Sequence, residues 1–175
     1  MPGYYVAVSA MGRDRIGLAD DIASWIEASG GNVEESKMAV LGGEFAVIML
    51  VSGPAAAAER LVESAAEQGE SLGLRLEAEE TTAPRASGKG LPYSIETVSL
   101  DSPGIVHAVT REIRALGISI EDLETSSSAA PWTGAPVFRM KARVILPDGL
   151  GVAAFREHMD ELAHRRNLDL RLDPV

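Results

Sequence analysis

Apolar residues follow two different periods in the first half of the chain, and each period predicts one kind of element. A recurrence every three or four residues is typical of an amphipathic helix, whereas alternation or a short apolar run is typical of a strand. These patterns predict helices over residues 16–29 and 54–68. They predict strands over residues 4–10, 32–40, 44–52 and 72–78. Gly30 and Gly69 are expected to end the two helices, and Gly42-Gly43 is a typical hairpin turn.

The second half of the chain repeats this order, so one unit is present twice. The copies align without a gap from Asp14 with Asp101, through Gly17 with Gly104, to Gly30 with Gly117. Strands are predicted over residues 93–100, 118–126, 136–146 and 167–173. The first helical stripe has Ser102 as a good N-cap and Pro103 as a good first helical residue. The second stripe consists of Val152, Phe155, Met159 and Leu162.

The element order βαββαβ in each copy predicts an α+β fold made of two ferredoxin-like domains. A right-handed βαβ crossover leaves room for one strand between its two ends. The result is a four-stranded antiparallel sheet with both helices on one face. We expect the first domain at residues 1–80, a polar linker at 81–91 and the second domain at 92–175.

The third strand of each copy predicts a different environment for the helix-free face of its sheet. Residues 44–52 are apolar on both faces, which predicts that the second face is also buried, against the sister domain or another chain. In residues 136–146, apolar positions alternate with Arg139, Lys141 and Arg143. This alternation predicts a wet face or a polar interface.

Composition and charge exclude several classes of function. The chain has 175 residues, of which 46% are apolar, and a formal net charge of −10, so it is a packed acidic protein and a poor binder of DNA or RNA. It has no cysteine and three scattered histidines, so no metal or cofactor is expected. The longest apolar run, residues 45–51, is too short to span a bilayer, and no signal peptide is visible. A cytoplasmic location without membrane contact is therefore expected.

Asp14 and Asp101 lie beside the predicted start of the first helix in each copy, close to Gly17 and Gly104. The first N–H groups of a helix have no partner within it and attract a carboxylate. Glycine lets a ligand approach the backbone closely, and the aspartate can accept hydrogen bonds from an ammonium group. Each loop therefore suits an amino-acid zwitterion. The alternative is that the aspartate merely favours the helix start electrostatically.

Short motifs around these loops resemble a known family. The element order, "DRIG" or "DSPG" before the first helix and "GGNVEE" or "GISIED" after it, is similar to the ACT domain, a small-molecule regulatory module. The resemblance covers nearly the whole chain as a tandem pair. Two segments, "LGGEFAVIMLVSGP" and "APWTGAPVFRMKARVILP", resemble more narrowly the glycine cleavage system transcriptional repressor group. The resemblance implies regulation by a small amino acid, with glycine or serine as the first candidates.

By the same resemblance, a ligand would bind where the loop after the first strand of one domain meets the start of the second strand of a paired domain. The implied residues of the first copy are Gly12, Arg13, Asp14, Arg15, Ile16, Gly17 and Asn32. Those of the second copy are Ser99, Asp101, Ser102, Pro103, Gly104 and Ser119. The first copy departs from the common loop at Ile16, where proline is usual, and the second has no amide at Ser119. We favour the first loop because the Asn32 amide can both donate and accept hydrogen bonds.

Three rival functions compete with amino-acid sensing. Acyl-phosphate hydrolysis would use Arg13 and Arg15 with Asn32, but an acidic loop repels phosphate, so no enzyme is expected. A DNA-binding repressor would need a helix-turn-helix, and none is visible in the sequence. We therefore expect the chain to act on another regulatory protein instead. The remaining rival is a ligand-free interaction module that forms a homo-oligomer. In it, Trp132 would be either a lid over the second core or an anchor for a partner.

Overall fold

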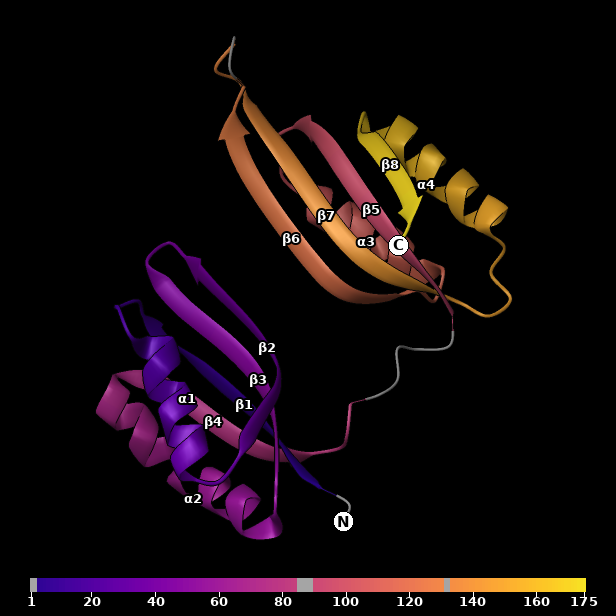
Figure 1. The fold of residues 1–175 in the computed structure, drawn as a ribbon. Coiled ribbons are helices and arrows are strands. Elements are labelled where there is room, and N and C mark those ends of the chain that lie inside the picture. The colour runs from indigo at the N-terminus through magenta and orange to yellow at the C-terminus, as the bar shows by residue number, and fades with distance from the viewer. Residues whose placement is uncertain (1–2, 85–89, 131–132) are drawn as a thin grey trace. The chain divides into compact units, whose positions relative to one another are not determined.

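A computed structural model describes residues 3–84, 90–130 and 133–175, so the hypothesis on Trp132 lies outside the described residues. These residues form two compact units, one on each side of residues 85–89 (Figure 1). The first unit contains β1 (Tyr4–Arg13), α1 (Leu18–Ala28), β2 (Asn32–Leu41), β3 (Glu44–Gly53), α2 (Ala55–Leu72) and β4 (Leu74–Thr81). The second unit contains β5 (Gly90–Leu100), α3 (Ile105–Ala115), β6 (Ser119–Ala129), β7 (Pro136–Pro147), α4 (Val152–Arg166) and β8 (Asp169–Pro174).

Each unit is built on one antiparallel sheet of four strands. The strand order is β2-β3-β1-β4 in the first unit and β6-β7-β5-β8 in the second. Both helices of a unit cover the same face of its sheet (Figure 1). The structure therefore confirms the predicted pair of ferredoxin-like βαββαβ folds, including the hairpin at Gly42 and Gly43, whose φ angles are 61° and 82°.

The core of each unit lies between its sheet and its two helices. In the first unit, Val8 of β1 packs in one cluster with Ile22 of α1 and Leu61 of α2, all fully buried. The second unit has an equivalent cluster that includes Ile95, Val109 and Phe155. Burying a side chain of this size contributes about 1.5–3 kcal/mol to folding. The periodic apolar stripes of the sequence thus face inward, and the loops remain at the surface.

The prediction that Gly69 ends the second helix is wrong. α2 continues to Leu72 and ends at Gly73, whose φ of 69° is in the left-handed region. A Cβ placed on Gly69 would lie 2.8 Å from the carbonyl oxygen of Leu74 and 3.0 Å from the backbone nitrogen of Leu76. Gly69 is therefore a position where α2 touches the backbone of β4, and it is not a stop signal.

The helix-free faces of the two sheets differ. On β3, Ile48 points away from the core and is 57% exposed, so the first unit does not itself supply the burial predicted for this face. On β7, Arg139, Lys141 and Arg143 are all exposed, which confirms the predicted polar face.

Candidate functional site

The first helix of each unit begins directly after a glycine with a left-handed backbone. Gly17 precedes α1 with a φ of 93°, and Gly104 precedes α3 with a φ of 89°. Residues with a Cβ disfavour this conformation by roughly 1–2 kcal/mol, so the turn itself requires glycine in both copies. Within the described ranges, no side chain caps α1 or α3. The first N–H groups of both helices are therefore available at the loop.

The predicted start of α3 at Ser102 and Pro103 is wrong. Both residues precede the helix, which begins at Ile105 after the turn through Gly104. The φ angle of proline suits the second position of a turn as well as the first residue of a helix, so composition did not separate the two possibilities. The predicted start of α1 is also early, because Ile16 and Gly17 belong to the turn and the helix begins at Leu18.

Gly12 and Arg13 were expected in the loop, but both belong to β1. Gly12 pairs with Phe45 of β3, and Arg13 pairs with Glu44. A Cβ on Gly12 would lie 2.8 Å from Cδ2 of Leu74. Packing against the start of β4 therefore explains this glycine without a ligand.

One backbone hydrogen bond holds each loop against the start of the neighbouring strand. The N–H of Asp14 donates to the carbonyl of Gly43 at 3.0 Å, and the N–H of Asp101 donates to that of Pro136 at 2.9 Å. These bonds occupy equivalent positions in the two units, because Phe45 aligns with Phe138. The two loops therefore have the same backbone anchor.

The aspartates of the two loops differ in their partners. The hydroxyl of Ser127 on β6 donates to Oδ2 of Asp101 at 2.8 Å. Among the described residues, the side chain of Asp14 has no hydrogen bond or ion pair. A carboxylate accepts several hydrogen bonds, so Asp101 keeps capacity for a second donor. Sequence reasoning missed Ser127, because three consecutive serines lie on β6 and only the strand register selects one of them.

Charge at the helix start also distinguishes the two loops. Asp20 and Asp21 occupy the first turn of α1, and Nη1 of Arg15 lies 2.9 Å from Oδ2 of Asp21. The first turn of α3 contains no acidic residue. Carboxylates in the first turn of α1 already compensate its helix dipole, so a ligand carboxylate is better placed at α3. Asp14, whose carboxylate has no side-chain partner among the described residues, favours an ammonium group at α1.

Asn32 and Ser119 lie at the opposite end of the sheet from the loops. Asn32 pairs with Ser52, which also pairs with Tyr5 near the start of β1, whereas Arg13 ends that strand. At about 3.4 Å per residue, the separation along the strand is roughly 27 Å. Ser119 pairs with Ile145, far from the β7 end that holds Asp101. No single unit therefore brings a predicted loop together with its predicted strand residue.

The side chain of Asn32 is held by its own strand. Its Nδ2 donates to Oε1 of Glu34 at 3.1 Å, and the hydroxyl of Ser52 donates to the same oxygen. The hydrogen bonds from Ser52 and then from Asn32 lower the pKa of Glu34 below its ordinary value. The amide is thereby oriented while its oxygen remains an acceptor.

The arrangement proposed for acyl-phosphate hydrolysis is not assembled within the first unit. Nε of Arg13 lies 3.7 Å from Oε1 of Glu44, and Arg15 binds Asp21, both at the loop end of the sheet, whereas Asn32 lies at the other end.

Residues 3–84, 90–130 and 133–175 contain no cluster of three metal-ligating side chains. No helix in these ranges is long and apolar enough to cross a membrane.

These observations define the chain as a duplicated ferredoxin-like protein with one anchored loop per unit. Residues 4–79 match the family model of the ACT domain. The first unit is therefore an ACT domain, and the second unit repeats its element order and its sheet order.

The chain is also similar over most of its length to other proteins. It is 28% identical to the glycine cleavage system transcriptional repressor of Escherichia coli (strain K12) over 127 residues. These residues make up 73% of this chain and 67% of the relative. A crystal structure of an unknown protein from Galdieria sulphuraria matches 99% of both chains with a TM-score of 0.82 and 31% identity. The structure of a candidate glycine cleavage system transcriptional repressor matches with a TM-score of 0.74 over 99% of this chain and 98% of its own, at 19% identity, which shows the fold alone.

Proposed function

We propose that this chain is an amino-acid-sensing regulatory protein that acts by binding another regulatory protein in transcriptional control. The main support is that both units present the same constellation: a left-handed glycine, an uncapped helix start and an adjacent aspartate. The relationship to glycine cleavage system transcriptional repressors supports a small amino acid, glycine or serine first, and a link to glycine metabolism.

A complete site of this kind needs two domains. The loop of one domain would supply Asp14 or Asp101, and the second strand of another would supply Asn32 or Ser119. The partner domain is either the sister unit or a unit of a second chain in a homo-oligomer. The separation of loop and strand residues at opposite ends of each sheet supports this part of the proposal, because one unit alone does not bring them together.

The size of the ligand limits its affinity. At a ceiling of about −1.5 kcal/mol per non-hydrogen atom, the roughly five such atoms of glycine cannot bind better than about −7.5 kcal/mol, a low micromolar Kd. Such a site reports a metabolite concentration and does not store the metabolite. A signal arises only if the amino acid binds one arrangement of the domains more tightly than another.

Isothermal titration calorimetry of the full chain with glycine, serine, alanine and leucine tests this proposal. We expect binding of a small amino acid at micromolar to millimolar Kd, lost in Asp14→Ala, in Asp101→Ala or in both. The matched control is Asp160→Ala, which removes an exposed acid from α4 and should leave the titration unchanged. Binding that survives removal of both loop aspartates would contradict the zwitterion model.

A ligand-free interaction module is the second candidate. Two contacts favour it, because Ser127 already binds Asp101 and the acids of α1 already face its helix start. It predicts no response to any amino acid and unchanged binding of the protein partner. Specific DNA binding by the purified chain alone, in a mobility shift at physiological salt, would contradict both candidates.

A further inference from the structure

A groove of about 600 Å³ lies between the two helices of the first unit. We name it the α1–α2 groove, and the residues of its lining that matter below are Trp25, Ser29, Arg60, Glu63, Glu67 and Ser71. Nε1 of Trp25 donates a hydrogen bond to the hydroxyl of Ser64 at 3.0 Å, which fixes the indole ring. Trp25 is 9% exposed, so the part of its ring that reaches the groove forms an apolar wall.

The acidic side chains of this groove have no cation of their own. Glu63 and Glu67 are exposed, and among the described residues neither carboxylate has a hydrogen bond or an ion pair. Arg60 also lines the groove, but its Nε and Nη2 donate to the carbonyl of Ser29. The helices around the groove, α1 and α2, carry seven acidic residues and one arginine. The groove is therefore strongly electronegative.

The second helices of the two units, α2 and α4, align from their C-terminal ends. Each helix is followed by a residue with a left-handed backbone, Gly73 with a φ of 69° and Asn167 with a φ of 53°. Counting back two residues from these positions aligns Ser71 with Arg165. The strands that follow keep the same offset, because β4 and β8 pair with β1 and β5 in equivalent register. The two units can therefore be compared residue by residue across this groove.

Arg165 bridges the two helices of the second unit. Its Nη2 lies 3.1 Å from Oε1 of Glu112 on α3, and its Nη1 lies 3.5 Å from Oε2 of Glu161 on α4. The equivalent positions of the first unit are Ser71 for the arginine, Trp25 for Glu112 and Glu67 for Glu161. The first unit thus keeps one of the two carboxylates that hold the guanidinium, replaces the other by an aromatic wall and lacks the arginine.

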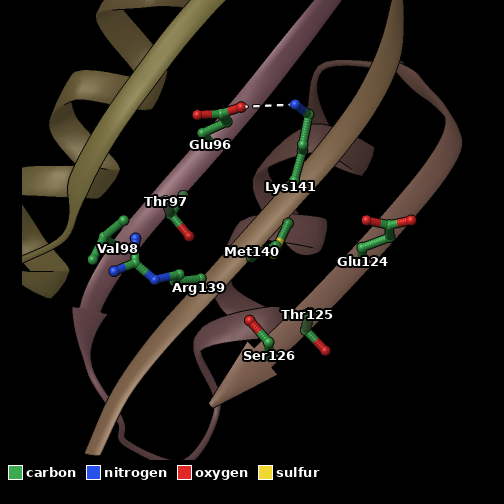
Figure 2. A pocket seen from close by; sticks show the side chains of 9 residues that line it. All are labelled: Glu96, Thr97, Val98, Glu124, Thr125, Ser126, Arg139, Met140 and Lys141. Atoms are coloured by element: carbon green, nitrogen blue, oxygen red, sulfur yellow. Dashed lines mark ion pairs between the residues drawn. The ribbon is translucent and has the colours of Figure 1, made fainter. Parts of the chain in front are cut away.

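The second unit also supplies its own cation to the cleft on the helix-free face of its sheet. Nζ of Lys141 lies 2.9 Å from Oε1 of Glu96, as Figure 2 shows. The hydrogen bond between them lowers the pKa of Glu96 and raises the pKa of Lys141. Ion pairs within the unit therefore bridge both clefts of the second unit, whereas the α1–α2 groove has carboxylates without a bound cation.

We propose that the α1–α2 groove binds an arginine side chain of the protein on which this chain acts. A guanidinium is planar and weakly hydrated, so it packs against an aromatic wall and pairs with a carboxylate more readily than an ammonium group does. The acidic residues of α1 and α2 attract a basic surface and favour it over an acidic one. The inference rests on the proposed function for the identity of the partner as a protein, but arginine recognition does not depend on amino-acid binding.

An NMR titration of the full chain with a capped peptide, acetyl-Ala-Ala-Arg-Ala-Ala-amide, tests the groove. The indole N–H signal of Trp25 reports binding, and the Trp132→Phe variant assigns that signal. We expect a Kd of roughly 1–10 mM, because one partly exposed ion pair contributes little by itself. The same peptide with citrulline in place of arginine has nearly the same shape without the charge, and it should bind at least about 5-fold more weakly.

Two variants locate the binding in the groove. Glu67→Gln should raise the Kd of the arginine peptide at least about 5-fold, and its matched control is Glu59→Gln, which removes an exposed acid of α2 outside the groove. Ser71→Arg gives the first unit the residue of the equivalent position and should fill the groove from within, raising the Kd at least about 10-fold. Its control is Ala56→Arg, which adds the same charge to α2 outside the groove and should change the Kd less than about 2-fold.

Equal affinity for the arginine and citrulline peptides, or unchanged binding in both Glu67→Gln and Ser71→Arg, would overturn the proposal. The absence of any shift of the Trp25 signal up to about 20 mM peptide would overturn it too. The calorimetric titration with free amino acids remains a separate measurement. Peptide binding without any amino-acid response contradicts only the sensor, and an amino-acid response without peptide binding contradicts only the groove.

Discussion

Gly69→Ala is a substitution for which helix propensity and packing predict opposite signs. Within an exposed helix, alanine is more favourable than glycine by about 1 kcal/mol. In this chain the new methyl group would lie 2.8 Å from the carbonyl oxygen of Leu74 and 3.0 Å from both N and Cβ of Leu76. Two of these three atoms belong to the backbone of β4, so no side-chain rotation relieves the overlap. The helix or the strand must move.

Packing should outweigh propensity. Overpacking a well-filled core costs typically 1–3 kcal/mol, and a contact against backbone belongs at the upper end of that range. Subtracting the helix gain of about 1 kcal/mol leaves a net destabilisation of about 2 kcal/mol. The first unit should carry the loss, because Gly69, Leu74 and Leu76 all belong to it.

Urea unfolding followed by the fluorescence of Trp25 measures this loss. A Trp132→Phe background leaves Trp25 as the only tryptophan, and it lies in α1 against the core of the first unit. Ser71→Ala is the control, because Ser71 is an exposed residue of the same helix and its substitution should stabilise by up to about 0.5 kcal/mol. If Gly69→Ala also stabilises the chain, the close approach of α2 to β4 is wrong.

Two further predictions concern other contacts of the first unit. Nε and Nη2 of Arg60 donate to the carbonyl of Ser29 at 3.1 and 2.6 Å, so Arg60→Ala should destabilise by about 1–2 kcal/mol in the same urea assay, and an unchanged midpoint would contradict this role. Hydrogen bonds from Ser52 and Asn32 lower the pKa of Glu34. Their stabilising effect is therefore present above the unfolded pKa and is lost as pH falls through the folded pKa. Ser52→Ala should raise the pKa of Glu34 in an NMR titration, and a pKa that does not move would exclude Ser52 as its cause.

Local sequence features identified the elements and the loops because the forces behind them act over a few residues. Leu18, Ile22 and Ile26 recur at helical spacing, so this segment forms a helix wherever one side of it can be buried. Gly17 and Gly104 recur because a left-handed turn is required where each first helix begins. The order of these elements then selects the ferredoxin-like arrangement, since few connections satisfy right-handed crossovers.

Only tertiary contacts decided how far the elements extend and which candidate residues meet. Gly69 remained in the helix because β4 passes beside it, a contact that no local pattern records. Strand register placed Asn32 at the far end of the sheet from Asp14 and selected Ser127 as the partner of Asp101. Distance along the chain does not determine distance across a sheet, because antiparallel pairing brings together residues that are far apart in sequence and separates those at opposite ends of one strand.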